Sequence, residues 1–433
     1  MSNRIIVSIT IIVLLCLLAL PPCSTQAQSL DDDKAGMRSL FSSVDEAALS
    51  IPESLTRTPH DLAMYFQSIS DSDSGRVRAA YTWITGNVRY ELQEHGDSLN
   101  SWVFDPNEVL RIRKTVCEGY CVLFESICSE MGIHTQRVHG YLKGMGGNIC
   151  DQPDGNGNHA WSAVMISGKW HLLDCTQSAE FAVAGQQVSP YSKEFYLLTP
   201  PSQLIYSHFP YNDYWQLLDD KLTLADFERL PHVTPVFFEL GLGLPRSVSC
   251  NCTANDSLVL SVTAPDDVVV AAQLKTGEIE VEGRMTFEQR DNGNYVIQAR
   301  FPEPGDFRLD IYGRLKSNSD GILHHAATIL VSVQTVSRIN DEFPMIYRPY
   351  RDVEAYLYTP MVSTIRAGQM ETFRIKAPTA QEVYVVCGDD WTQLSRNGDL
   401  FEGNVVVGSG GADIAAKFPG QPHYETLVHF DTE

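Results

Sequence analysis

The chain has 433 residues and a formal net charge of −22. A chain of this length exceeds the size of one hydrophobic core, so we expect two to three domains. The excess of carboxylates argues against nucleic acid and against an anionic membrane surface as partners, because both repel a polyanion.

The N-terminal region has the pattern of a secretory signal peptide over residues 1–27. Arg4 precedes an apolar run, 5–20, and small residues follow up to Ala27. These are the three parts of such a signal. The run is shorter than the roughly 20 apolar residues of a membrane span, which leaves an uncleaved anchor as the alternative. We expect a secreted, extracellular protein without an integral membrane span after signal removal, in which residues 28–60 form a polar, loosely packed N-terminal lead-in.

The next predicted element of note is a helix that begins at Cys117. Apolar residues recur at intervals of three and four from Cys117 to Met131, and Gly132 is a stop signal. Thr115 and Glu118 have the spacing of a capping box. Cys117 then lies in the first turn, where the helix dipole favours a thiolate. The alternative is that Cys117 merely begins a core-facing stripe, as buried thiols often do.

A β-hairpin is predicted over residues 160–175, with Ser167-Gly168 as its two-residue loop. The register set by this loop makes His159 the diagonal neighbour of Asp174, within reach of its side chain. A carboxylate on an apolar face is costly unless it is paired, and His159 is the available partner. A buried ion pair without catalysis would have the same pattern. The cysteine at a helix start favours a catalytic group of three.

These segments resemble the transglutaminase-like superfamily, whose Cys-His-Asp triad occurs in this chain order. The resemblance implies an α+β papain/transglutaminase-like catalytic domain over residues 61–245, with Cys117 as nucleophile, His159 as general base and then acid, and Asp174 as the orienting group. The segment 195–218 is similar to the one that follows the catalytic domain in the kyphoscoliosis peptidase and hillarin branch. Gln177 departs from the family, which often has tryptophan there.

Short alternating strands dominate the chain after residue 245. Strand-like segments are separated by Asn-Gly and Pro-Gly turns, and they cover residues 257–265, 268–274, 295–301 and 307–314. The segment 373–378 echoes 260–265. We therefore expect two all-β sandwich domains, 246–340 and 341–433, which the resemblance identifies as immunoglobulin-like. We expect them to bind a protein partner or to position the enzyme.

The cysteines and two sequons bear on the compartment. Of ten cysteines, Cys16 and Cys23 lie in the predicted signal peptide. Secretion makes some disulfides expected. The pairings that we consider are Cys150 with Cys175, and Cys250 or Cys252 with Cys387. Asn251 and Asn255 begin Asn-x-Ser/Thr acceptors, which predicts a glycoprotein. The sequence has no CxxC pair and no complete calcium loop, so we expect no metal and no cofactor.

We therefore expect a secreted cysteine peptidase that acts on a protein or peptide through a thioester acyl-enzyme. The Cys117 amide would serve the oxyanion hole, with Trp102 as a candidate second donor. A protein cross-linking or deamidating transglutaminase uses the same triad and is one alternative. The other is a non-catalytic adhesion or scaffolding protein that works through its β-sandwich modules.

Overall fold

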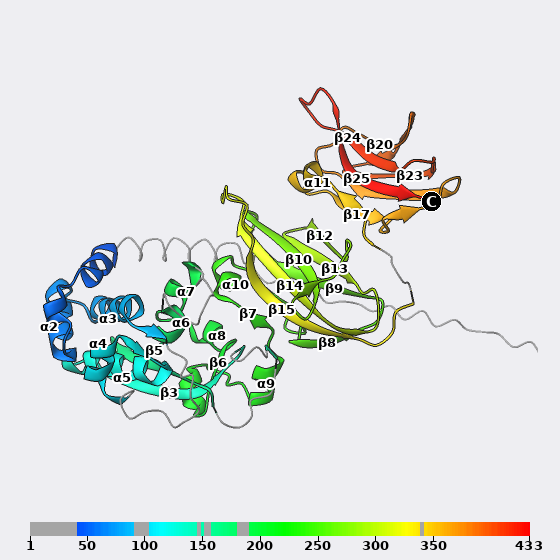
Figure 1. Ribbon diagram of the computed structural model, residues 1–433. Coiled ribbons are helices and arrows are strands. Elements are labelled where there is room, and N and C mark those ends of the chain that lie inside the picture. The colour runs from blue at the N-terminus through cyan, green and yellow to red at the C-terminus, as the bar shows by residue number, and fades with distance from the viewer. Residues whose placement is uncertain (1–40, 91–103, 145–148, 151–156, 180–189, 338–341) are drawn as a thin grey trace, which may run out of the picture. The chain divides into compact units, whose positions relative to one another are not determined.

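The computed structural model describes residues 41–90, 104–144, 149–150, 157–179, 190–337 and 342–433 (Figure 1). The predicted signal peptide, residues 28–40 of the lead-in and Trp102 lie outside the described residues. None of the helices in these described ranges combines the length and the hydropathy that a membrane span requires.

Helices form one half of the first domain. They are a helical segment at 41–49, η1 (Glu53–Leu55), α2 (Pro59–Ile69), α3 (Asp73–Asn87), α4 (Pro106–Ile112) and α5 (Cys117–Glu130). Thr58 and Ser72 cap α2 and α3 by accepting hydrogen bonds from first-turn amides. Val44 and Ala48 are buried in the same core as α5, so this part of the lead-in is packed, contrary to our expectation. Val44 and Ala48 are four residues apart, so they lie on one face of the helical segment and can pack on the core although the segment is mostly polar.

The α5 helix was correctly predicted, but its N-terminal cap was not. Its N-cap is Val116, which makes no side-chain capping bond, and the hydroxyl of Thr115 has no hydrogen-bond partner among the residues that the structure describes. Glu118 instead accepts a hydrogen bond from Arg137. At the other end, Gly132 has φ of 75° and the amide of Ile133 donates to the carbonyl of Cys128, as in a Schellman motif.

An antiparallel sheet forms the other half of the domain, in the order β5-β4-β3-β6. Its strands are β3 (Thr135–Leu142), β4 (His159–Ile166), β5 (Lys169–Leu173) and β6 (His208–Pro210). The predicted hairpin is confirmed, with Ile166 paired to Lys169 and positive φ at Ser167 and Gly168. The strand β5 ends before 175 because Asp174 caps the next helix. One face of the sheet packs on α5, as Figure 1 shows for the blue and cyan elements.

Short elements complete this part of the chain. The strands β1 (Arg89–Tyr90) and β2 (Lys114–Thr115) pair in parallel directly before α5. The others are α6 (Cys175–Ser178), α7 (Pro190–Phe195), α8 (Pro201–Leu204), η3 (Asp213–Gln216), α9 (Leu224–Arg229), β7 (His232–Val233) and α10 (Pro235–Glu239). Trp161, Leu172, Phe195 and Tyr196 form a second core on the sheet face that α5 does not cover.

Two β-sandwiches follow, as predicted. The first contains β8 (Asn251–Ala254), β9 (Ser257–Thr263), β10 (Val268–Thr276), β11 (Ile279–Glu280), β12 (Thr286–Asp291), β13 (Asn294–Arg300), β14 (Gly305–Leu315) and β15 (His324–Val333). One of its sheets has the order β11-β10-β14-β15-β7 with β8 also on β15, and the other has the order β12-β13-β9. The strand β7 therefore pairs with β15 although it precedes residue 246.

The second sandwich ends the chain. It contains β16 (Met345–Ile346), α11 (Arg348–Asp352), β17 (Tyr356–Thr359), β18 (Thr364–Ile365), β19 (Met370–Lys376), β20 (Glu382–Cys387), β21 (Asp390–Gln393), β22 (Ser395–Asn397), β23 (Leu400–Val406), β24 (Ala412–Lys417) and β25 (Tyr424–Thr432). Its sheets have the orders β16-β25-β24-β20-β21 and β17-β19-β23-β22. Inward-facing residues of both sheets, such as Phe373 and Phe430, form its core.

A disulfide joins Cys150 to Cys250, with Cα atoms 5.8 Å apart. Both pairings suggested from sequence are therefore wrong, because Cys175, Cys252 and Cys387 are free thiols. Cys175 is buried in the same core as α5, a position that the spacing of cysteines in the sequence does not reveal.

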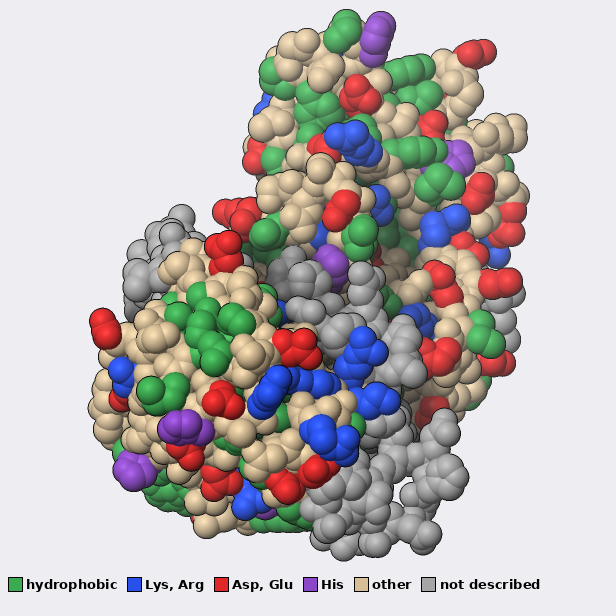
Figure 2. Space-filling view, turned by 60° about the vertical axis from the view of Figure 1, so that its left-hand side comes forward, with side chains coloured by type: hydrophobic (Ala, Val, Ile, Leu, Met, Phe, Trp, Pro, Cys, Tyr) green, Lys and Arg blue, Asp and Glu red, His purple; other side chains and the backbone are tan. Residues whose placement is uncertain are grey.

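Despite the net charge of the chain, acidic and basic side chains both occur over the face of the molecule in Figure 2.

Candidate active site

Cys117 occupies the first position of α5, where its amide has no partner within the helix. Its side chain is partly exposed, whereas Cys121 and Cys128 on the same helix are buried. The sequence thus correctly predicts that Cys121 and Cys128 belong to the core. Tyr90 lies on β1, which pairs with β2 directly before α5. Burial, together with the nearby Cys117 and Asp174, raises the pKa of Tyr90 to about 12.

His159 and Asp174 meet as the hairpin register predicts. Nε2 of His159 lies 2.7 Å from Oδ2 of Asp174, and both side chains are inaccessible to solvent or nearly so. The other carboxylate oxygen, Oδ1, accepts hydrogen bonds from the amides of Thr176 at 2.7 Å and Gln177 at 3.2 Å. Asp174 is therefore the N-cap of α6, which fixes the carboxylate plane by backbone contacts.

A second histidine, His208, contacts the same carboxylate. Its Nε2 lies 2.9 Å from Oδ2 of Asp174, and its side chain is fully buried. Sequence reasoning missed this residue, because His208 comes 34 positions after Asp174 and reaches it only through the pairing of β6 with β3. The segment that contains His208 was noticed for its family resemblance alone.

Gly140 on β3 allows β6 to lie close to β3 and to Trp161 on β4. It is paired with His159 on one side and with Pro210 on the other. A Cβ atom at Gly140 would lie 2.8 Å from both the Cα of Pro210 and the Cη2 of Trp161, closer than real Cβ contacts allow. The absence of a side chain lets the two strands and the indole pack together.

The electrostatics of this group follow from burial and pairing. Burial opposes charge on Asp174, but the hydrogen bonds and charges of His159 and His208 hold its pKa well below the usual range. Burial likewise opposes charge on His159, yet Asp174 and the nearby Cys117 raise its pKa to about 10. Burial lowers the pKa of His208, so this second imidazole is neutral.

The second ring nitrogen of His159 completes the arrangement. Nε2 is the atom that contacts Asp174. Nδ1 is buried and has no hydrogen-bond partner among the described side chains. The thiol of Cys117 lies close enough to His159 to affect its pKa. The structure thus brings His159 into contact with Asp174 and places the thiol of Cys117 near His159, while the catalytic roles of the three residues stay predictions.

His159, Asp174 and His208 also form a group whose donor atoms all lie within 4.8 Å of one another, as metal ligands can. Both Nε2 atoms, however, lie at hydrogen-bond distance from one shared oxygen, Oδ2 of Asp174. A metal needs its ligands directed at a common point between them. A hydrogen-bond network accounts for the contacts as they stand.

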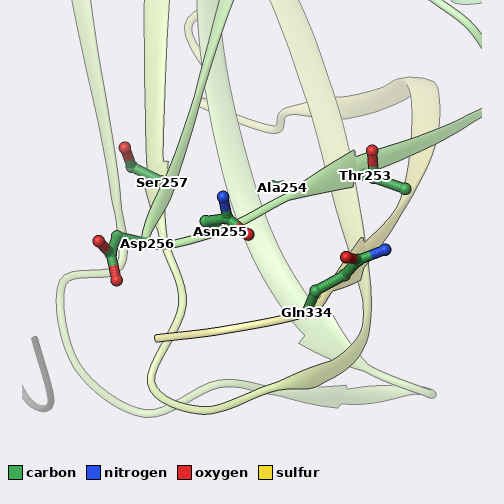
Figure 3. Close-up of a pocket in the computed structure, with 6 residues that line it drawn as sticks. All are labelled: Thr253, Ala254, Asn255, Asp256, Ser257 and Gln334. Atoms are coloured by element: carbon green, nitrogen blue, oxygen red, sulfur yellow. The ribbon is translucent and has the colours of Figure 1, made fainter. Parts of the chain in front are cut away.

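Away from this group, a polar hollow lies where β8 turns into β9 (Figure 3). Asn255, Asp256 and Gln334 line it, together with Thr253, Ala254 and Ser257. The oxygen of the Asn255 side chain accepts a hydrogen bond from Thr335 at 3.1 Å. Asn251, the other predicted glycosylation acceptor, is exposed on β8. Both sequons therefore lie at the surface of the first sandwich, apart from the triad in the sequence and fold.

Comparison with known families agrees with this description. Residues 61–175 match the family model of the transglutaminase-like superfamily, and residues 224–344 match that of the KY-like, immunoglobulin-like domain. The part of the chain that carries Cys117, His159 and Asp174 is therefore a transglutaminase-like domain. This family fits an enzymatic activity, and the immunoglobulin-like domain fits protein interaction.

Individual relatives point to one branch of that superfamily. Kyphoscoliosis peptidase of Homo sapiens is 35% identical over 252 residues, which are 58% of this chain and 37% of the relative. The Mus musculus protein of that name is 32% identical over 232 residues, 51% of this chain and 34% of the relative. Hillarin of Drosophila melanogaster is 30% identical over 222 residues, 47% and 26% of the two chains. The matches thus span about a third of the length of these relatives.

Proposed function

We propose that the protein is a secreted cysteine peptidase of the transglutaminase-like superfamily. The observation that carries this proposal is the hydrogen bond from His159 to Asp174, with Nδ1 of His159 left for Cys117 at a helix start. Two relatives at 32% and 35% identity are named peptidases, which favours hydrolysis over the alternatives.

The proposed reaction begins with the thiolate of Cys117, formed when His159 takes its proton. The sulfur attacks the amide carbonyl carbon, and the amide of Cys117 at the first helical position stabilises the oxyanion. The C–N bond breaks as imidazolium His159 returns its proton to the leaving amine, which leaves a thioester on Cys117. Water, deprotonated by His159, then attacks the thioester and releases the acid. If an amine attacks instead of water, the same chain of steps forms a cross-link.

Alkylation by iodoacetamide near neutral pH tests the first step. We expect Cys117 to react at least about tenfold faster than Cys252, because an imidazolium partner favours the thiolate. Cys252 is an internal control, since it is a half-buried free thiol whose pKa is raised by burial. The sites are assigned by peptide mass spectrometry without reduction of the Cys150–Cys250 disulfide.

The matched variant is His159→Ala, in which the advantage of Cys117 over Cys252 should disappear. Equal labelling of the two thiols in the unmodified protein would contradict an enzyme and favour the scaffolding role. A glutamine-containing protein incubated with a labelled primary amine then separates peptidase from transferase, because only the transferase incorporates the label.

We propose secretion and N-glycosylation on separate grounds. The predicted signal peptide and two surface sequons support them, and the Cys150–Cys250 disulfide is typical of an oxidising compartment. Expressed in a eukaryotic secretory host, the full chain should appear in the medium with a mass that falls on treatment with an N-glycosidase. Asn251→Gln and Asn255→Gln assign the glycan. Protein that stays inside the cell without a glycan would overturn this proposal and leave the catalytic one untouched.

A further inference from the structure

His208 is an additional polar group in contact with the triad. It lies on β6, on the opposite side of β3 from His159, and its ring centroid is 5.4 Å from that of His159. The ring of Trp161 packs edge-on against it at 5.0 Å. A buried imidazole in such a place is costly unless each ring nitrogen has a partner.

Both ring nitrogens of His208 are in fact satisfied. Nε2 lies 2.9 Å from Oδ2 of Asp174, and Nδ1 lies 2.8 Å from the hydroxyl of Ser207. A carboxylate oxygen can only accept, so Nε2 carries the hydrogen. In the neutral ring Nδ1 then accepts from the hydroxyl of Ser207, whose other acceptor, the carbonyl of Leu204, is more distant at 3.3 Å. This assignment makes His208 a neutral donor with a fixed tautomer.

We propose that His208 is a positioning residue for the reaction, which donates from Nε2 to Asp174 and so keeps that carboxylate ionised and directed at His159. This inference rests on the proposed function, because it assigns a role within the same triad. The hydrogen bonds to Asp174 then come from both sides: two backbone amides hold Oδ1, and the two histidines share Oδ2.

A neutral donor suits this role better than a charged one. The titratable groups that face His208 are Asp174 at the N-cap of α6, His159 on β4 and Tyr196 after α7. A cation at position 208 would neutralise Asp174 and repel imidazolium His159. Burial lowers the pKa of His208 and keeps it uncharged, so the full carboxylate charge remains available to His159.

The test follows the alkylation rate of Cys117 by iodoacetamide between pH 4 and 9. In His208→Phe, which has no donor, Asp174 loses one of the contacts that direct it at His159, so His159 is held less precisely and stabilises the thiolate of Cys117 less well. We therefore expect the acid-side midpoint of the rate to move to higher pH and the rate near pH 5 to fall by about tenfold, the effect of one lost hydrogen bond to a charged group. His208→Gln retains an N–H donor and should lie within about twofold of the unmodified protein.

His232→Phe is the matched control, since it removes a half-buried histidine outside this group whose pKa is also lowered by burial, and it should leave the profile unchanged. A second measurement needs no variant: the histidine nitrogen NMR spectrum at neutral pH should show His208 as the neutral tautomer protonated at Nε2.

The inference is overturned by an unshifted profile in folded His208→Phe, by a His208→Gln profile as altered as that of His208→Phe, or by a different tautomer or a charged His208. If His159→Ala and Asp174→Asn also leave Cys117 labelling unchanged, the proposed function itself fails. If those two variants abolish the labelling and His208→Phe does not shift it, only the role of His208 fails.

Discussion

Replacing Asp174 with alanine is expected to lower the free energy of unfolding by about 3–5 kcal/mol, the range for removal of one partner from a buried ion pair. The carboxylate accepts hydrogen bonds from His159, His208 and the amides of Thr176 and Gln177. Alanine leaves all these donors unpaired in a region with almost no solvent access. Preferential labelling of Cys117 should also be lost, because nothing then orients His159.

Urea denaturation measures the stability, and two variants separate its causes. Asp174→Asn keeps an acceptor for the α6 amides, so its stability should be intermediate while labelling of Cys117 is still lost. Asp413→Ala is the matched control, because Asp413 pairs with His429 at 2.7 Å in the second sandwich but is partly exposed. An exposed pair of this kind contributes at most about 1 kcal/mol. Equal losses in Asp174→Ala and Asp413→Ala would contradict our account of the site.

The loss in Asp174→Ala should depend on pH with a defined sign. The pKa of His159 is raised from 6.5 to about 10, so the stability from the pair is complete below pH 6.5 and is lost as the pH rises through 10. The pKa of Asp174 is lowered from 3.8, so the same stability is present above pH 3.8 and is lost as the pH falls further. The difference in the free energy of unfolding between the unmodified protein and Asp174→Ala should therefore be larger at pH 6 than at pH 10.

Reduction of the Cys150–Cys250 disulfide is expected to cost about 4–5 kcal/mol of stability. The two cysteines are 100 residues apart, and the cross-link restricts the unfolded chain over that whole loop. His159, Asp174 and His208 all lie inside the loop, whereas Cys117 lies outside it. The predicted loss is therefore one of stability, set by the length of the closed loop.

The urea midpoint with and without a reducing agent tests this effect. The Cys150→Ser, Cys250→Ser double variant should have the low midpoint under both conditions. Cys252→Ser is the control, because it removes a free half-buried thiol two residues from Cys250 and should leave the difference unchanged. A midpoint that reducing agent does not move in the unmodified protein would contradict the prediction.

The contact of His159 with Asp174 and the position of Cys117 at a helix start could be predicted from the sequence, because each depends on local rules. Apolar periodicity defines α5 and places Cys117 at its start, and a two-residue loop fixes the register that brings His159 to Asp174. His208 depends instead on the pairing of β6 with β3, across a connection with no local signature. The Cys150–Cys250 bond was missed for the same reason, since it joins parts of the chain that only the tertiary fold brings together.

The cap of α5 shows a different limit. Thr115 and Glu118 have the right spacing for a capping box, but Thr115 belongs to the β2 strand and Arg137 of β3 binds Glu118. The ion pair of Glu118 with Arg137 forms in place of the capping box, and the spacing of residues in the sequence could not reveal it.

The pairing of β7 with β15 has a practical consequence for dissecting the chain. A cut at residue 245, where the β-rich composition begins, would separate His232 and Val233 from Thr328 and Ala327 and remove this part of the pairing along that edge of β15. Thr223 caps α9 with a reciprocal pair of hydrogen bonds, so the chain offers a cleaner breakpoint just before it. A fragment that starts just before Thr223 retains β7, an edge strand of the first sandwich.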